Sequence, residues 1–234
     1  MIRYLWEKEN ICMRDMPRPG LSYLLPVSRE LYATRVYLRR FRHRDAQPLL
    51  DLLVRNESWL AMGLPPLPAR FELSDMKQEI LRRQRLERQG SRLDLAIFDK
   101  ESHRLVGEVS LHSISWGIQL SGGLGFWLAE WSAGNGLMKE ALATMLSFVF
   151  EESPLHRIWA ATTHCNVRTQ ELLRRLGFTH DGTIRQELFL AGTWQDMHHF
   201  SLLRDEYDNL AERWISKGYL GIHPNQKARH GKQR

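Results

Sequence analysis

The chain has 234 residues, the length of a single domain with short appendages. Hydrophobic residues make up 43% of it and charged residues 26%, as in soluble globular proteins, and no run of about 18 apolar residues predicts a membrane-spanning helix. The two cysteines form neither a metal-ligand spacing nor a disulfide framework. The first residues lack the apolar core of a secretory signal, so we expect a cytoplasmic protein without membrane attachment.

Positive charge gathers at the C-terminal end. The formal charge is +6, and residues 214–234 hold five basic residues but no acidic one, so residues 1–213 carry only +1. The last ten residues follow Pro224 and lack apolar periodicity, which predicts a disordered basic tail. Such a tail is usually only solvated. It could also attach weakly to RNA or the ribosome, with an affinity that falls steeply with salt.

Proline and glycine divide the chain into three parts. Residues 1–34 contain three prolines and a glycine and are expected to form an irregular extension. The hydrophobic pattern then becomes regular, which predicts a domain over residues 35–207. Residues 208–234 are expected to hold the end of a helix and the basic tail.

Periodicity assigns the elements of this domain. In chain order they are a strand over 36–41, a helix over 46–54, a loop over 58–68, a helix over 75–89, strands over 93–98, 105–114 and 123–128, a helix over 137–151, a strand over 157–163, a helix over 167–176, and a hairpin of strands 183–190 and 194–203. This order is typical of an α+β fold built on a mixed sheet.

The most informative segment is the glycine-rich turn Gly134-Asn135-Gly136, which opens the helix at Leu137. The first N–H groups of a helix have no internal partner, and the helix dipole places positive charge beside them. Glycines let the backbone approach a phosphate closely. The same turn is also common as a plain strand-to-helix connection, so its wider context must decide.

Four further patterns supply that context. They are Arg35-Val36-Tyr37-Leu38-Arg39 followed by Asp45-Ala46; Gly134-Asn135-Gly136-Leu137-Met138-Lys139-Glu140-Ala141-Leu142; His156-Arg157-Ile158 with Asn166-Val167-Arg168-Thr169 and Leu176-Gly177-Phe178; and Gly192-Thr193-Trp194-Gln195-Asp196. In this order and spacing, residues 35–207 resemble the ribosomal-protein N-terminal alanine acetyltransferases, the RimJ/RimL-like branch of the GNAT superfamily.

The resemblance implies a mixed, mostly antiparallel sheet whose central strands splay apart around acetyl-CoA, with helices on its faces. The pyrophosphate would be held by backbone groups of the turn, at Gly134, Asn135, Gly136, Leu137 and Met138. The pantetheine amides would pair with a strand edge at Phe126, Trp127 and Leu128. The cofactor arm would also contact Asn166 and Thr169. Thr169 replaces the family's serine as the candidate acid for the departing thiolate. Trp131 and Ala133 replace side chains that commonly support the phosphates.

Acetyl transfer to an amine requires a group that removes the amine proton, because most amines are protonated at pH 7. We prefer Glu108 and Glu187, on two of the predicted strands, as candidate catalytic bases. His112 is an alternative. Each could instead be an ordinary surface or packed side chain. Cys165 is expected to be a small buried residue rather than a nucleophile, and the histidines offer no convincing metal site.

The resemblance leaves the acceptor open. It implies the N-terminal α-amine of a protein, with direct attack in a ternary complex. A small-molecule amine, such as an antibiotic or a polyamine, would use the same cofactor site. A third possibility is an acyl-CoA-binding module without turnover, which the changes at Trp131 and Ala133 would suit.

Overall fold

The computed structural model describes residues 29–190 and 192–220. Most of the predicted N-terminal extension and the basic tail lie outside these residues. The elements are β1 (Leu31–Tyr32), β2 (Val36–Arg40), η1 (His43–Asp45), α3 (Ala46–Arg55), α4 (Glu57–Leu60), α5 (Leu73–Arg88), β3 (Leu93–Asp99), β4 (Leu105–Ser115), β5 (Ser121–Leu128), η2 (Glu130–Ser132), α6 (Leu137–Glu152), β6 (Arg157–Thr163), α7 (Val167–Leu176), β7 (Thr179–Leu190), β8 (Thr193–Leu203) and α8 (Arg204–Ser216).

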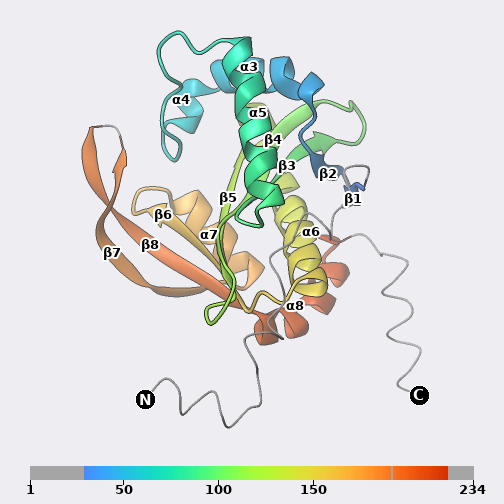
Figure 1. The fold of residues 1–234 in the computed structure, drawn as a ribbon. Helices are drawn as coiled ribbons and strands as arrows, with labels where there is room; N and C mark the ends of the chain where they lie inside the picture. Colours follow the sequence, from blue (N-terminus) through green and yellow to red (C-terminus); the bar gives the residue numbers. More distant parts are fainter. Residues whose placement is uncertain (1–28, 191, 221–234) are drawn as a thin grey trace.

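The eight strands form one sheet in the order β1-β2-β3-β4-β5-β6-β8-β7. Every neighbouring pair is antiparallel except β5 and β6, which are parallel. The predicted α+β class with a mixed, mostly antiparallel sheet is therefore confirmed. Figure 1 shows β7 and β8 as a long hairpin that leans away from the rest of the sheet.

Strand alternation places two hydrophobic cores on opposite faces of the sheet. In β3, Leu95 and Ile97 face α6, whereas Ala96 and Phe98 face α3 and α5. Along β4 the same alternation sends every second side chain, among them Glu108 and His112, away from the α6 core. The α5 face of the sheet is the one that carries polar groups.

The structure differs from the predicted elements mainly at their ends. Residues Leu31–Tyr32 pair with β2 although the sequence predicted an irregular segment there, because a two-residue edge strand shows no periodicity. The predicted loop 58–68 begins with the short helix α4. The predicted boundary at residue 207 falls within α8, whose Tyr207 and Trp214 are buried in the α6 core.

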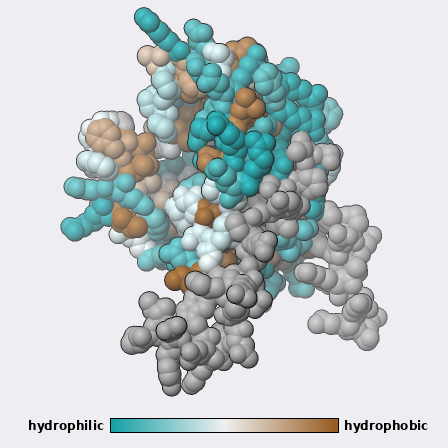
Figure 2. Space-filling model, in the orientation of Figure 1, coloured by the Kyte–Doolittle hydropathy of each residue, from teal (hydrophilic) through white to brown (hydrophobic). Residues whose placement is uncertain are grey.

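None of the helices in the described part of the chain combines the length and the apolarity that a membrane span needs. An apolar surface feature lies at the outer end of the β7–β8 hairpin, where Phe189 and Trp194 are exposed and pack edge to face (Figure 2).

Candidate active site

The two central strands separate soon after they meet. β5 and β6 pair in parallel register at only three positions, from Ser121 opposite Arg157 to Gly123 opposite Trp159. Beyond these pairs the edge of β5 no longer faces a strand, and a cleft of about 650 Å³ opens there. Among the residues that line the cleft are Phe126, Trp127, Leu128, Gly134, Gly136, Leu137, Met138, Asn166 and Thr169. All but one of the residues predicted to bind the cofactor thus surround one cavity; Asn135 does not line it.

The turn before α6 has the backbone shape of an anion cradle. Gly134 and Gly136 both have φ +83°, a left-handed conformation that strains any residue with a Cβ atom. No atom lies within 4 Å of the position that a Gly134 Cβ would take, so the loop is open to an approaching ligand. Gly136 caps α6, whose first N–H groups have no acceptor within the helix. The geometry fits the diphosphate of a nucleotide cofactor, with Lys139 also lining the cleft.

The start of α7 forms the opposite wall. The Asn166 Oδ1 atom accepts a hydrogen bond from the Thr169 backbone N–H at 3.2 Å, so one side of the amide caps the helix. The Nδ2 atom faces the connector between α4 and α5 and lies 4.0 Å from the position of a Gly63 Cβ. The N–H groups of Asn166 Nδ2 are therefore directed across the cleft. Thr169 lies one turn further along the helix and is partly exposed to the same space.

Trp59 joins both walls of the cleft. Its indole Nε1 donates to the Leu128 carbonyl at 3.0 Å, and the Arg168 guanidinium stacks over its ring at 5.4 Å. One carbonyl at the end of β5 is thereby occupied by the protein itself. From the family resemblance, Trp59 was expected either to line an acceptor groove or simply to pack; the spacing gave no signal that α4 folds back onto β5.

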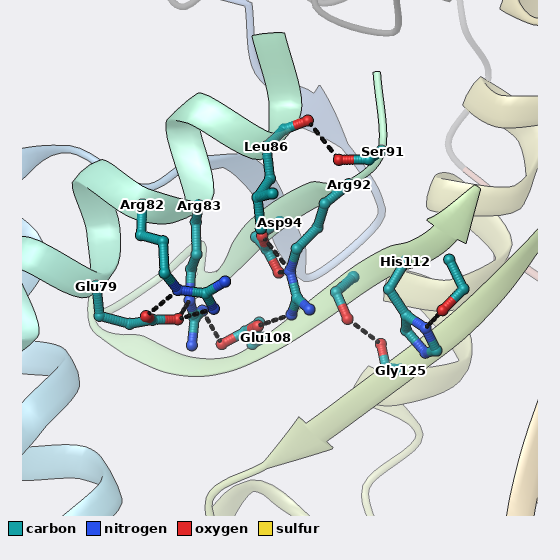
Figure 3. A network of polar contacts seen from close by, with 12 residues as sticks. Glu79, Arg82, Arg83, Leu86, Ser91, Arg92, Asp94, Glu108, His112 and Gly125 are labelled. Atoms are coloured by element: carbon teal, nitrogen blue, oxygen red, sulfur yellow. Dashed lines mark hydrogen bonds and ion pairs between the residues drawn. The ribbon is translucent and has the colours of Figure 1, made fainter. Parts of the chain in front are cut away.

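Glu108, a predicted base, lies in a cluster of balanced charges on the α5 face (Figure 3). Its Oε2 accepts from Arg83 at 2.9 Å, and Arg92 lies 3.9 Å from its Oε1. Burial raises the pKa of Glu108, while Arg83 opposes that rise. The same arginine also binds Glu79, whose pKa the hydrogen bonds from Arg82 and Arg83 lower to about 2 although burial acts in the other direction. Glu108 does not line the cofactor cleft.

His112 lies four residues further along β4 than Glu108, outside this cluster (Figure 3). Its ring rests against β5 where two residues lack side chains: a Cβ at Gly123 would lie 2.5 Å from His112 Cε1, and one at Gly125 would lie 3.5 Å from Cδ2. The ring is therefore next to the point where β5 and β6 separate. Burial lowers the pKa of His112 and the charge of Arg92 lowers it further, which keeps the imidazole neutral at pH 7.

Glu187, the second predicted base, is paired rather than free. It lies 2.5 Å from His199 Nε2 across the β7–β8 hairpin. The His199 ring stacks on Trp159, and Trp159 meets His112 edge-on with the ring centres 5.5 Å apart. The rings of His199, Trp159 and His112 thus form an aromatic row on the α5 face of the sheet, with Glu187 next to the His199 end. Trp159 and His199 were missed by sequence analysis, although strand alternation could have placed both on the face that carries His112.

Several other expectations can be compared with the structure. Trp131 is 58% exposed and faces a separate cavity of about 920 Å³ beside α3, not the cofactor cleft. Cys165 was expected to be buried, and this was wrong: it is exposed just after the end of β6, where the chain turns into α7. His164, His180 and His198 have neighbouring rings, yet no group of three or more potential metal ligands has suitable geometry within residues 29–190 and 192–220.

Comparisons with known proteins agree with this geometry. The acetyltransferase (GNAT) domain matches residues 35–179. The chain is 28% identical over 170 residues to the ribosomal protein uS5-alanine N-acetyltransferase of Escherichia coli, covering 71% of this chain and 86% of that protein. It is 26% identical over 181 residues to the putative ribosomal N-acetyltransferase YdaF of Bacillus subtilis, covering 74% and 93%.

A solved structure shows the same fold. RimJ of Mycobacterium smegmatis, in complex with CoA-disulfide, superposes with a TM-score of 0.76 at 23% identity and covers 82% of this chain and 95% of that chain. The strand separation, the glycine cradle and the match over residues 35–179 lead to one assignment. The chain belongs to the GNAT acetyltransferase family, in its RimJ/RimL-like branch, and is an N-acetyltransferase that uses acetyl-CoA.

Proposed function

We propose that this enzyme acetylates the N-terminal α-amine of a protein, with ribosomal proteins as the first class to test. The support comes from the relatives, since both curated proteins described above are named for acetylation of ribosomal proteins and match the chain over almost their whole length. His112, like Glu108, does not line the cleft itself, but its imidazole lies beside Gly123, where β5 and β6 separate, and we propose that it meets the incoming amine there. That imidazole, His112, is the single observation that carries the proposal of direct transfer.

We infer roles for the residues that line the cofactor cleft. Bound acetyl-CoA supplies an activated acetyl group as a thioester. The N–H groups of Gly136, Leu137 and Met138 would hold its diphosphate, while the open edge of β5 from Phe126 to Leu128 would align the pantetheine arm as an added strand would. Asn166 donates its Nδ2 hydrogens to that arm. Thr169 lines the same cleft, and its hydroxyl would supply a proton to the departing thiolate.

His112 is the residue that we propose for proton removal from the amine. Its Nδ1 lies 3.2 Å from the Ser113 hydroxyl, and its Nε2 makes no hydrogen bond within residues 29–190 and 192–220. In the tautomer whose Nδ1–H donates to the Ser113 hydroxyl, Nε2 has a free lone pair and can accept a proton directly or through one water molecule. Glu108 is a weaker candidate because two arginines already surround its carboxylate.

Glu187 is better suited to orient a partner than to act on the amine. It contacts His199 and is separated from His112 by the Trp159 ring. The carboxylate would fix the His199 ring and favour an ammonium group arriving along the aromatic row. We therefore propose a role for Glu187 in attracting and orienting the acceptor.

Competition between acceptors tests the function. The enzyme and acetyl-CoA are incubated with equimolar peptides that begin with Ala or Ser, the same peptides with a blocked N-terminus and one internal Lys, spermidine, and an aminoglycoside; mass spectrometry then follows each product. We expect the free N-terminal peptides to have the highest specificity constants. Preference for a small amine would move the enzyme to that substrate class, and absence of any acetylation despite cofactor binding would indicate a binding module.

A further inference from the structure

Arg35 is the residue just before β2, and its side chain reaches the glycine-rich loop that precedes α6. Its Nε donates to Glu140 Oε1 at 2.7 Å, and its Nη2 lies 2.6 Å from the same oxygen. Nη2 also donates to the Asn135 carbonyl at 2.9 Å, and the Arg35 backbone N–H donates to Glu140 Oε2 at 2.7 Å. One residue therefore holds both carboxylate oxygens and the loop that precedes α6.

Glu140 lies where its charge would compete with the cofactor. It is in the first turn of α6, and only 3% of its surface is exposed. Side chains on a helix point back toward its N-terminus, so the carboxylate lies beside the helix end that receives the diphosphate. An uncompensated carboxylate there would offset the positive field at the N-terminus of the helix and would repel a diphosphate.

The guanidinium also touches the cradle. A Cβ at Gly136 would lie 3.3 Å from Arg35 Nη2, so the cation packs directly against the N-cap of α6. Trp131 and Ala133 offer the loop no polar side chain, and Trp131 faces the separate cavity beside α3. Arg35 is the one described cation that contacts the loop backbone from outside α6.

We propose that Arg35 is a positioning residue that cancels the charge of Glu140 and so sets the affinity of the loop for the diphosphate of acetyl-CoA. The proposal rests on the cofactor site described above. It predicts opposite effects for two substitutions. Arg35→Met leaves Glu140 uncompensated and weakens diphosphate binding, whereas Glu140→Gln leaves the Arg35 charge in excess and strengthens it.

The test compares CoA with pantetheine, which lacks the diphosphate, by calorimetric titration of the full-length protein. We expect Arg35→Met to weaken CoA about tenfold and to leave pantetheine nearly unchanged. Glu140→Gln should tighten CoA about threefold, and the double variant Arg35→Met/Glu140→Gln should return close to the wild-type value. Arg44→Met, at an exposed arginine of η1, is the matched control and should change neither affinity.

Each outcome decides between explanations. If both single variants weaken CoA and pantetheine alike, the ion pair only stabilises the fold and the proposal is overturned. Thermal unfolding of each variant monitors folding; if Arg35→Met does not fold, the direction of change in Glu140→Gln and in the double variant still decides. Failure of the wild-type protein to bind CoA would instead refute the cofactor site itself.

Discussion

The glycine at position 123 offers a way to displace His112 without replacing it. A methyl group there would lie 2.5 Å from His112 Cε1 and 2.8 Å from the Trp159 ring. Carbon atoms in contact normally lie about 3.5–4.0 Å apart, so in Gly123→Ala the imidazole must move by roughly 1 Å. Overpacking of this kind costs about 1–3 kcal/mol, which a domain with about 5–15 kcal/mol of stability tolerates.

A base displaced by about 1 Å loses on the order of a hundredfold in rate. We therefore expect Gly123→Ala to lower kcat about a hundredfold while the dissociation constant of CoA stays within about threefold, because the cradle at Gly134–Met138 is untouched. His112→Gln should lower kcat about 10²–10⁴-fold. Both are measured by thiol release at saturating acetyl-CoA and peptide.

The double variant Gly123→Ala/His112→Gln decides whether the two losses share one cause. If displacement of the imidazole is the reason, the double variant is no slower than His112→Gln alone. Multiplied losses would show that Gly123→Ala damages the site by another route, and the assignment of His112 would then fail.

Further predictions concern the cofactor and the protons. Gly136→Asp should abolish the gain of about 2.7 kcal/mol in unfolding free energy that a hundredfold excess of acetyl-CoA gives wild type; an unchanged gain in thermal shift would disprove the cradle. Because burial lowers the pKa of His112, kcat should rise with pH through a value below 6.5 and then stay level, and His112→Gln should lack this limb. Thr169→Val should lower kcat about tenfold more than it weakens CoA, unlike a binding residue. Cys165→Ala should keep at least about half of the turnover; trapping of an acetylated Cys165 that forms and decays at the rate of turnover would exclude direct transfer.

The residues predicted for the cofactor side of the site, except Asn135, line one cleft, because much of that side is built from local pattern. A strand, two glycines and an amphipathic helix in succession predict a glycine turn at a helix start, which its wider context identified as a candidate cradle, and Gly136 does cap α6 with a positive φ. The glycine turn needs no knowledge of tertiary contacts. Asn166, by contrast, was placed at the cofactor arm by the family resemblance alone, and its role as the cap of α7 was not predicted.

The catalytic side depends on which side chains meet across strands, and single-strand patterns do not give this. Glu108 and His112 alternate identically along β4, yet Arg83 of α5 and Arg92, just before β3, lie over Glu108, and His112 stays outside the cluster. The pairing of Glu187 with His199 depends on the hairpin register, which an irregularity between Ile184 and Leu188 shifts. A bulge of this kind has no signature strong enough to read from composition.

The short parallel contact between β5 and β6 affects how well the backbone amides of β5 are protected from hydrogen exchange. With three residue pairs at this seam, the sheet consists of two halves held together mainly by the helices that cover them. Amides of β5 on the open edge, from Phe126 to Leu128, have no strand partner on that side until a ligand arrives. Their hydrogen exchange should be fast in the free protein and slow once CoA is bound, whereas amides of β3, paired on both sides, should exchange slowly in both states.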